Sequence, residues 1–442
     1  MAQDVGKARR VPVPGAEHQE QAHLDDLTTA KGKKGAPYTN PTDWRGLHAI
    51  ASEADNPTGV PGLQIDGYFP DDSKTTKEPG NNYGNREFPH DSQFVIRFPD
   101  KWNGKLVITG PPGVRGQYAN DFIIGDFVLG KGYAFASTDK GNSGYRFYSG
   151  EKPPGAPVAD WHRRVEQLTI AVKEAAERHY GKEPDYTYIT GISNGGYLTR
   201  YALENTPDLY DGGVDWEGVL WHPDGPNLLN FLPPALKNYP NYRESGSLAA
   251  YGAMIKAGFE PSSEFLWPFF NTWYWGLTQR IFREPFDPTY PGAETEYDYP
   301  GRTNPPPQAP EPVQRQAQAI KDAVKKVSLT GKIGKPLITL HGTLDALILM
   351  TKSSDVYAEL IKKEGRSDKH RYYRIAGGTH VDSLYNQYPD KLRPILPCYR
   401  VAFDRLEKWV EKKLPPPQSQ WVPKPEAGDV INSCPPLEEQ GA

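Results

Sequence analysis

Ser193 lies in a motif that is typical of an activated serine nucleophile. The segment Tyr186 to Thr190 carries the aromatic and β-branched residues of a strand, and it runs directly into Gly-Ile-Ser-Asn-Gly at positions 191–195. Tyr197 to Glu204, which follows, has a helical pattern. Glycines on both sides of the serine let the strand and the helix approach each other, so that a sharp turn exposes the hydroxyl. This order predicts acyl transfer through Ser193.

Asp345 and His380 are the candidates for the acid and the base that such a serine needs. A serine hydroxyl is a weak nucleophile near neutral pH, so it requires a histidine base that a carboxylate orients. Asp345 follows the predicted strand Pro336 to Leu340, and His380 follows the predicted strand Arg371 to Ile375. Serine, acid, histidine is the chain order of α/β-hydrolases. Because all three residues follow strands, we expect them to meet at the carboxyl edge of one sheet.

Other residues compete for these roles. Asp224, shortly after the predicted strand Val219 to Trp221, is the main rival for the acid, because a carboxylate at that edge could also reach the histidine. Asp345 could instead cap the helix that follows it, and His380 could be a loop histidine satisfied by backbone groups. His341 precedes the loop of the acid, so we expect it to support that turn rather than to act as the base.

An oxyanion hole needs two backbone N–H donors. One is expected from Asn194, the residue after the nucleophile. The other should come from the loop after the predicted strand Lys105 to Thr109, which has the sequence Gly-Pro-Pro-Gly-Val-Arg-Gly at 110–116. Proline has no N–H, so Gly113 and Val114 remain as the candidates. Arg115, in the same loop, is a candidate partner for a substrate carboxylate.

The elements that would position these residues alternate between strands and helices. Further strands are predicted at Leu63 to Phe69, Gln93 to Phe98 and Tyr133 to Thr138, and helices at Ala159 to Tyr180, Ser354 to Lys363 and Leu392 to Lys412. This alternation predicts an α/β fold with a mostly parallel, doubly wound sheet. Together with the serine motif, it predicts an α/β-hydrolase domain built from 41–222 and 334–442. Residues 1–40 are charged, have no apolar periodicity and are expected to be a mobile tail.

Residues 223–333 interrupt the alternation and are predicted to form an inserted domain. This stretch is rich in aromatic residues and proline. Its place between two strands would put it over the carboxyl edge of the sheet, so we expect a lid above the site. Trp267, Trp273 and Trp275 are candidates for substrate contacts through ring stacking. The alternative is that these aromatic residues form a core of the insertion itself.

Composition narrows the class of ligand. The chain has 442 residues, with 51 Lys and Arg against 55 Asp and Glu and a formal net charge of −4. A balanced charge argues against nucleic-acid binding and against anchoring to an acidic membrane. No apolar run approaches the roughly 18 residues of a transmembrane helix. We therefore expect a small or neutral molecule as the partner. Given the predicted acyl transfer, this would be a small-molecule or oligomeric ester. No metal at the site and no cofactor are expected, while the oligomeric state stays open.

Cys398 and Cys434 are the two cysteines of the chain. Two are too few for a disulfide scaffold and lack the spacing of a zinc site, so we expect one disulfide near the C-terminus, with two unlinked thiols as the alternative. A disulfide would require an oxidising compartment. The polar stretch from Met1 to Lys34 has no hydrophobic signal core and looks like the start of a mature secreted chain whose signal peptide a methionine has replaced.

Several of these segments together resemble the tannase and feruloyl esterase family of α/β-hydrolases. The segments that carry the resemblance are Tyr180 to Tyr188, the serine turn at 191–196, Pro207 to Gly212, His341 to Asp345 and Gly377 to His380. The resemblance extends over about 160–222 and 330–412. It implies hydrolysis of carboxylic esters, often phenolic ones, by Ser193, Asp345 and His380. It also implies an inserted lid and, for many members, secretion.

The chain departs from this family at two positions beside the triad. Members have a cysteine just before the serine and another just after the histidine, joined in a disulfide, where this sequence has Ile192 and Val381. The subfamily, and with it the substrate, therefore stays open. Many members also bind calcium in the lid, for which the candidate oxygen ligands here are Asp287, Glu294, Glu296 and Asp298. Their spacing fits no calcium loop, so a solvated acidic turn is the simpler interpretation.

The leading hypothesis is a serine esterase that acts on phenolic or aromatic esters. The sequence Ser-Asn-Gly-Gly at 193–196 is also similar to that of enzymes that hydrolyse 3-hydroxybutyrate oligomers, so hydroxyalkanoate oligomers or polyesters are the alternative substrates. A serine peptidase of the same fold is a further alternative, because acyl transfer uses the same triad. The last alternative is a non-catalytic binding protein of this fold, although such a protein would not need all three residues of the triad.

Overall fold

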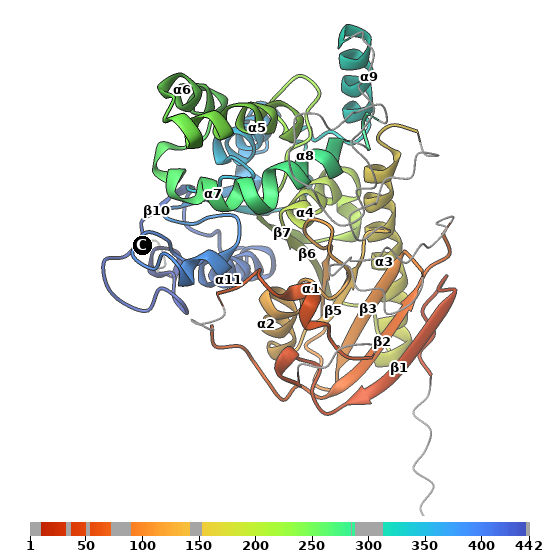
Figure 1. Ribbon diagram of the computed structural model, residues 1–442. Helices are drawn as coiled ribbons and strands as arrows, with labels where there is room; N and C mark the ends of the chain where they lie inside the picture. The colour runs from red at the N-terminus through yellow and green to blue at the C-terminus, as the bar shows by residue number, and fades with distance from the viewer. Residues whose placement is uncertain are drawn as a thin grey trace, which may run out of the picture.

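A ten-stranded sheet forms the centre of the computed structural model (Figure 1). The structure describes residues 10–31, 37–49, 54–71, 90–141, 153–283, 285–287 and 313–438. Within these residues the strand order is β1-β2-β3-β5-β4-β6-β7-β8-β9-β10. The strands are β1 (His18–Leu24), β2 (Gly62–Tyr68), β3 (Gln93–Pro99), β4 (Lys105–Thr109), β5 (Ala134–Thr138), β6 (Tyr186–Ile192), β7 (Gly212–Trp216), β8 (Leu337–Gly342), β9 (His370–Ile375) and β10 (Gln420–Val422).

Parallel pairing of the later strands gives the sheet a common carboxyl edge. β4 pairs in parallel with β5 and β6, and the pairs β6–β7, β7–β8, β8–β9 and β9–β10 are also parallel. Only the pairs that involve β1, β2 and β3 are antiparallel among the described strands. The predicted mostly parallel sheet is therefore confirmed. Residues that follow β4, β6, β8 and β9 emerge at the same edge, where open α/β sheets bind their ligands.

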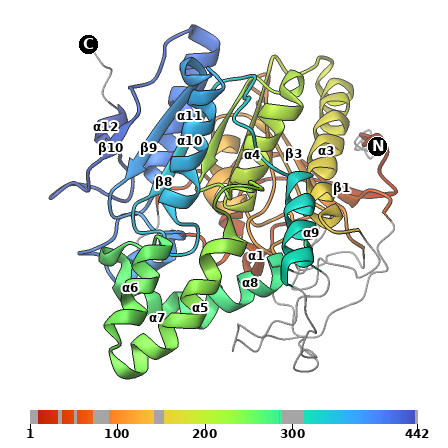
Figure 2. The same cartoon turned by 90° about the horizontal axis from the view of Figure 1, so that it is seen from above.

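Helices cover both faces of this sheet (Figure 2). The helices outside the insertion are α1 (Pro41–Trp44), α2 (Asp126–Gly130), α3 (Ala156–Tyr180), α4 (Asn194–Asn205), α10 (Ser354–Lys363), α11 (Leu396–Lys412) and α12 (Pro435–Glu438). Neighbouring side chains of a strand point to opposite faces. A Cβ added at Gly212 of β7 would meet Leu406 of α11, whereas one added at Gly213 would meet Thr199 of α4. These two helices therefore lie on opposite faces and approach β7 closely.

The prediction of a mobile tail over 1–40 is wrong for His18–Leu24, which form the edge strand β1. All seven residues of β1 pair with Gly62–Tyr68 of β2. Ahead of the strand, Val11 and Val13 are buried against the core, and their N–H groups donate to glutamine side chains of β1. The segment is mostly polar, so backbone hydrogen bonds to a distant strand hold it, and a periodicity of apolar residues could not reveal them.

The strand before the insertion lies earlier in the chain than expected. The sequence predicts it at Val219 to Trp221, whereas β7 spans Gly212–Trp216. Its two consecutive glycines lower the strand propensity, but the close approach of helices on both faces requires them. The correction matters for the site, because the first residue after the strand is Glu217.

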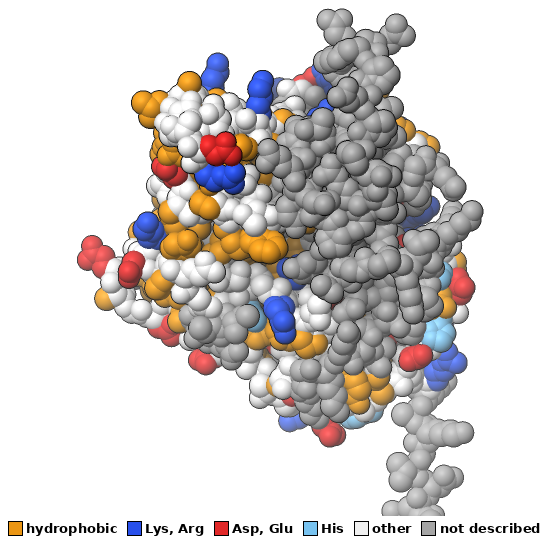
Figure 3. Space-filling view, viewed as in Figure 1, with side chains coloured by type: hydrophobic (Ala, Val, Ile, Leu, Met, Phe, Trp, Pro, Cys, Tyr) orange, Lys and Arg blue, Asp and Glu red, His pale blue; other side chains and the backbone are white. Residues whose placement is uncertain are grey.

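The described residues between β7 and β8, referred to as the insertion, are largely helical. Its helices are α5 (Leu228–Ser245), α6 (Leu248–Ala257), α7 (Trp267–Phe270), α8 (Gly276–Arg283) and α9 (Val313–Lys325). α5 packs against α6 and α8, and Figure 1 shows α5 to α8 gathered at one end of the molecule. On the face seen in Figure 3, hydrophobic side chains gather over α7. None of the helices in the described ranges is long and apolar enough to span a membrane.

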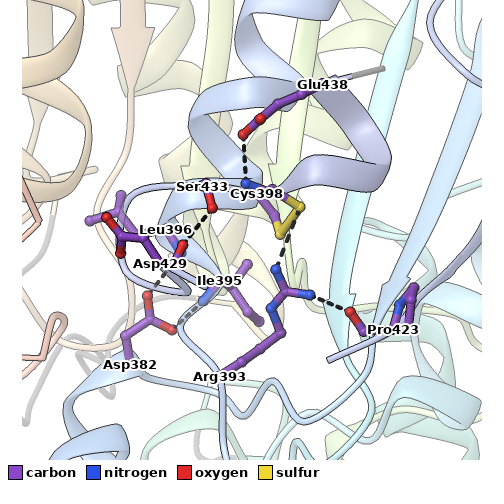
Figure 4. The surroundings of a disulfide bond; sticks show 10 residues. Asp382, Arg393, Ile395, Leu396, Cys398, Pro423, Asp429, Ser433 and Glu438 are labelled. Carbon is purple, nitrogen blue, oxygen red and sulfur yellow. Dashed lines mark hydrogen bonds between the residues drawn. A yellow bond between two sulfur atoms is a disulfide. The ribbon is translucent and has the colours of Figure 1, made fainter. Parts of the chain in front are cut away.

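The predicted disulfide between Cys398 and Cys434 is present and joins the start of α11 to the segment before α12. Figure 4 shows Arg393 beside it, with its guanidinium 3.8 Å from Cys434 Sγ. In the same region, the Asp382 carboxylate accepts two backbone N–H groups at the start of α11, at 2.7 and 2.9 Å. The disulfide therefore secures the helix end that also holds Asp382, which lies two residues after His380.

Candidate active site

Ser193 occupies a strained turn between β6 and α4. β6 ends at Ile192 and α4 begins at Asn194, and Ser193 between them has a φ of 57° and a ψ of −115°. A conformation of this kind costs a side-chain-bearing residue roughly 1–3 kcal/mol, so the surrounding structure must hold it. The Ser193 N–H donates to the Trp216 carbonyl of β7 at 2.9 Å, and the Val219 N–H donates to the Ser193 carbonyl at 3.2 Å. These bonds fix Ser193 at the carboxyl edge of the sheet.

The glycines of the serine turn are required by close backbone approach. A Cβ at Gly191 would lie 2.6 Å from the carbonyl carbon of Gly195, and a Cβ at Gly195 would lie 2.3 Å from the carbonyl oxygen of Gly110. Gly110 begins the loop after β4, which is predicted to supply an oxyanion donor. The Asn194 side chain contacts the same loop through a 3.3 Å hydrogen bond from Nδ2 to the Gly113 carbonyl. The loop after β4 and the serine turn are therefore packed together.

Of the two predicted donors, Gly113 contacts the serine turn, since its carbonyl accepts the hydrogen bond from Asn194. Farther along the loop, the N–H groups of Gly116 and Tyr118 donate to the Asp43 carboxylate at 2.8 and 2.9 Å. Gly113 has a φ of 50°, in the left-handed region that favours glycine. The N–H groups of Gly113 and Val114 therefore remain the candidates for the second oxyanion donor.

Asp345 and His380 lie side by side and are hydrogen bonded. His380 Nδ1 is 2.8 Å from Asp345 Oδ2, and the other carboxylate oxygen accepts the Leu347 and Ile348 N–H groups at 2.8 and 2.9 Å. His341 Nε2 lies 3.3 Å from Asp345 Oδ2. Burial opposes ionisation of this carboxyl, but His380 and His341 outweigh the effect of burial and hold the pKa of Asp345 well below its usual range. The carboxylate is therefore charged and able to orient His380.

Two glycines allow the loops of Asp345 and His380 to meet. A Cβ at Gly342, the last residue of β8, would lie 2.3 Å from the carbonyl carbon of Gly378. The Leu344 N–H donates to the Gly378 carbonyl at 2.8 Å. The structure therefore brings these two predicted residues into contact because their loops approach without side chains between them.

Glu217 is a third ionisable group at this site, and sequence reasoning missed it. Its Oε1 accepts the Gly342 N–H at 2.9 Å, and its Oε2 lies 3.8 Å from His380 Nδ1. Burial, and then the charge of Asp345, raise the pKa of Glu217 well above its usual range. The error came from the misplaced strand. A glutamate directly after the short strand Gly-Gly-Val-Asp-Trp at 212–216 is the signal that could have identified it.

Asp224 does not join this buried group. Its side chain is exposed and pairs with Lys321 of α9, so the rival for the acid is wrong. His341 supports the turn of the acid, as the sequence predicts. Its Nδ1 is 2.6 Å from Ser354 Oγ, and its Nε2 is 2.7 Å from the Ile348 carbonyl.

The three ionisable groups could also be considered as metal ligands. Polar atoms of Glu217, Asp345 and His380 all lie within 4.8 Å of one another. The 2.8 Å between His380 Nδ1 and Asp345 Oδ2 is the length of a charge-assisted hydrogen bond. Two ligands at about 2.0–2.1 Å from a tetrahedral zinc ion would stand roughly 3.3 Å apart. The geometry therefore fits a shared proton better than a bound cation.

The candidate calcium ligands of the insertion are described only in part. Asp287 is buried, and its carboxylate lies 3.7 Å from the Arg283 guanidinium. Glu294, Glu296 and Asp298 lie outside the described residues. A solvated acidic turn at these positions stays the prediction, with a calcium site as its alternative.

Trp267 and Trp275 are wrong as substrate contacts, because both are fully buried in the insertion. The Trp267 indole N–H donates to Ser263 Oγ at 2.9 Å, within the insertion. The Trp275 indole N–H donates to the Ala346 carbonyl at 2.7 Å. Trp273, by contrast, is 57% exposed. The alternative interpretation therefore holds for Trp267 and Trp275, which form part of a core of the insertion. Trp273 remains the candidate for a substrate contact.

Arg115 supports the loop after β4. Its Nη1 donates to the backbone carbonyls of Asp43 and Arg45, which lie in and directly after α1. The Asp43 carboxylate holds the same loop from the other direction through backbone N–H groups. The structure thus gives Arg115 a role in holding the loop, and its contact with a substrate carboxylate stays a prediction.

Comparisons with known proteins give two family matches. Residues 85–215 match the family described as tannase and feruloyl esterase, and residues 308–439 match 3HB-oligomer hydrolase. A probable feruloyl esterase of Arthroderma benhamiae is 32% identical over 149 residues, 30% of this chain and 27% of that protein. A mono(2-hydroxyethyl) terephthalate hydrolase of Piscinibacter sakaiensis is 28% identical over 143 residues, 29% of this chain and 23% of that protein. The matched region spans about a quarter of the length of these relatives.

The fold has a solved counterpart at low sequence identity. The crystal structure of feruloyl esterase B from Aspergillus oryzae aligns over 92% of this chain and 89% of that chain, with a TM-score of 0.57 and 15% identity. At that identity the likeness shows the α/β-hydrolase fold alone. The tannase match contains Ser193, and the second match contains Asp345 and His380. The chain therefore has the α/β-hydrolase fold, and over 85–215 it is similar to the tannase and feruloyl esterase family.

Proposed function

We propose that this protein is a serine esterase that hydrolyses carboxylic esters through an acyl-enzyme on Ser193. The observation that carries the proposal is the 2.8 Å hydrogen bond between His380 and Asp345 at the sheet edge that also bears the glycine-flanked turn of Ser193. A serine on such a turn, a histidine and a charged carboxylate are the groups that acyl transfer requires.

In the proposed reaction, His380 Nε2 accepts the Ser193 hydroxyl proton as the serine oxygen attacks the ester carbonyl. Asp345 holds the Nδ1–H and stabilises the imidazolium. Backbone N–H groups at the start of α4 and in the loop after β4 receive the oxyanion. His380 then gives the proton to the leaving alcohol, and a water molecule repeats both steps to release the acid. This chemistry needs no cofactor.

Aromatic carboxylic esters are the proposed substrate class. The support is the tannase and feruloyl esterase match over 85–215 and the names of the relatives, which include feruloyl esterases and a terephthalate ester hydrolase. Within the insertion, Trp273 offers an exposed ring that could stack on an aromatic acyl group.

Oligomers of 3-hydroxybutyrate are the second candidate substrate. The 3HB-oligomer hydrolase match favours them, because it contains both Asp345 and His380. Specificity constants for methyl ferulate, methyl gallate, a butyrate ester and a hydroxybutyrate dimer separate the two classes. A dimer preferred over both phenolic esters would change the substrate assignment and leave the esterase chemistry intact.

The insertion is proposed to act as a lid, and the protein to work outside the cell or in another oxidising compartment. The hydrogen bond from Trp275 to the Ala346 carbonyl supports the first point, since Ala346 directly follows the proposed acid. The Cys398–Cys434 disulfide supports the second, because disulfides persist under oxidising conditions.

Replacement of the nucleophile tests the proposal. Ser193→Ala should lower ester hydrolysis about a million-fold by analogy with other triads, with an unchanged circular dichroism spectrum. A serine-directed phosphonate should add one adduct to the parent protein and none to the variant, and Ser383→Ala serves as a control that keeps activity. More than a few per cent of the activity left in Ser193→Ala would contradict the mechanism. Faster turnover of peptides than of esters would indicate a peptidase instead.

A further inference from the structure

We propose that Glu217 is a reserve carboxylate, which orients His380 only when Asp345 is lost. This inference rests on the proposed function. Glu217 lies at the carboxyl end of β7, between the strand that leads to the serine turn and the strand that leads to Asp345. It therefore occupies the next strand end from which a carboxylate can approach the histidine.

The geometry of Glu217 directs one carboxyl oxygen at the triad. Its Oε1 is held by the Gly342 N–H at 2.9 Å. Its Oε2 lies 3.8 Å from His380 Nδ1 and finds no hydrogen-bond partner among the described residues. The side chain is fully buried, and its backbone has a φ of 51°, a conformation that a side-chain-bearing residue rarely adopts. A polar atom that is buried without a partner is costly, so its position beside His380 requires an explanation.

A proton on Glu217 explains why two carboxyl groups can share this buried space. The groups around it are the carboxylates of Asp215, Asp345 and Asp382, all of which favour its protonated form, and His380, whose Nδ1 is already bonded to Asp345. Like charges a few ångströms apart in a buried site cannot both ionise readily. In the intact triad the serine proton moves to His380 and then to the leaving alcohol, while the proton on Glu217 stays in place.

The arrangement changes when Asp345 becomes neutral. In Asp345→Asn the negative charge that opposes ionisation of Glu217 is gone, and the imidazolium that forms during turnover has no carboxylate of its own. Glu217 can then release its proton to solvent, and its Oε2 can accept the Nδ1–H of His380. The reserve carboxylate would restore part of the orientation that the substitution removes.

A double-mutant cycle tests this role. Glu217→Gln alone keeps the shape of a protonated glutamate and should change kcat/KM by less than about threefold, because no interaction of the charged triad is lost. Asp345→Asn alone should lower kcat/KM by about a hundredfold. This loss is at the low end for an orienting group, because Glu217 compensates. The double variant should show the loss of about ten-thousandfold that is typical of a triad without its acid.

The pH profile separates positioning from mere support of the fold. In Asp345→Asn the remaining activity should rise with pH as Glu217 ionises, and this limb should vanish in the double variant. Asp224→Asn is the matched control, because Asp224 is an exposed acid in the loop after β7. It should leave the pH profile unchanged in both the parent protein and Asp345→Asn. Thermal unfolding checks that each variant folds. If Glu217→Gln does not fold, the double-mutant cycle is repeated with Glu217→Ala.

Two results would overturn the inference. One is a glutamine substitution that lowers kcat/KM by the same factor with and without Asp345. The other is a full ten-thousandfold loss in Asp345→Asn alone. Either result leaves the esterase proposal intact as long as Ser193→Ala remains inactive, so the two proposals fail separately.

Discussion

Trp275 donates its indole N–H to the carbonyl oxygen of Ala346, the residue that follows Asp345. The bond is 2.7 Å long and joins the insertion to the loop of the proposed acid. Both residues are fully buried. The placement of the acid therefore depends on how the insertion packs, although the two segments are far apart in the sequence.

Trp275→Phe should lower both stability and activity. The ring remains, but the Ala346 carbonyl loses its donor, which costs about 1–3 kcal/mol for a buried acceptor. The acid loop should become less well positioned, so kcat should fall several-fold with little change in KM. Trp267→Phe is the matched control, because its indole N–H bonds Ser263 within the insertion and its loss should reduce stability alone. Equal kcat values in the two variants would mean that the insertion does not help to position Asp345.

Gly195→Ala should disable the serine turn. The added Cβ would lie 2.3 Å from the Gly110 carbonyl oxygen, so the loop that carries the proposed oxyanion donors must move. Loss of an oxyanion donor lowers kcat by about a hundredfold or more. Gly252→Ala in α6 is the control, because nothing lies within 4 Å of its added Cβ and alanine favours a helix. Wild-type kcat in Gly195→Ala, measured with a chromogenic ester, would contradict the packing of this loop against the serine.

His370 should make stability depend on pH on the acid side. Burial, and then the positive charges of Arg200, Arg371 and Arg374, lower the pKa of His370 to about 3. In an unfolded chain histidine titrates near pH 6.5. Between these values the unfolded state binds a proton that the folded state refuses, so stability falls as pH falls through this window. The contribution of this one group is about 1.4 kcal/mol per pH unit.

His370→Gln checks the sign of this effect. Glutamine keeps a hydrogen-bonding group near Thr339 Oγ1, which now lies 3.0 Å from His370 Nε2, but it does not titrate. Urea unfolding at pH 6.5, 5.5 and 4.5 should show a shallower loss of stability in the variant than in the parent protein. Parallel curves would mean that folding does not shift the pKa of His370.

The disulfide should contribute stability and leave the chemistry alone. Cys398 and Cys434 are 36 residues apart, and closing a loop of that length is worth about 4 kcal/mol in the chain-entropy model. Cys398→Ser with Cys434→Ser should therefore unfold at a markedly lower temperature and keep its kcat/KM at 25 °C. Thiol titration of the denatured, unreduced protein gives the direct check. Two free thiols in protein from an oxidising preparation would refute the bond.

Trp273→Ala should reduce the preference for aromatic esters. A ring pair adds about 0.5–1.5 kcal/mol beyond apolar contact, so kcat/KM for methyl ferulate should fall several-fold relative to a butyrate ester. Trp421, at 60% exposure on β10, is the matched control for loss of an exposed ring. An unchanged ratio between the two esters in Trp273→Ala would remove this residue from the substrate site.

The sequence by itself determined the parts of this protein that depend on neighbouring residues. The turn of Ser193 is encoded by glycines within a few positions of it, and the strands before Asp345 and His380 are apolar enough to be recognised locally. Parallel strands end at one edge, so the expectation that these residues gather there needed no contact information. The disulfide followed from a pair of cysteines in a short C-terminal stretch.

Tertiary structure alone decided the features that depend on distant partners. β1 is polar and is held by backbone pairing to β2. Gly212 and Gly213 pair with β6 in the sheet, and α11 and α4 approach β7 so closely that glycine is required there. Exposure of a ring and the charge of a carboxyl are likewise set by what surrounds them. Trp275 is buried while Trp273 is exposed, and Glu217 shares the site of His380, because burial and electrostatic interaction depend on distance in space rather than on separation along the chain.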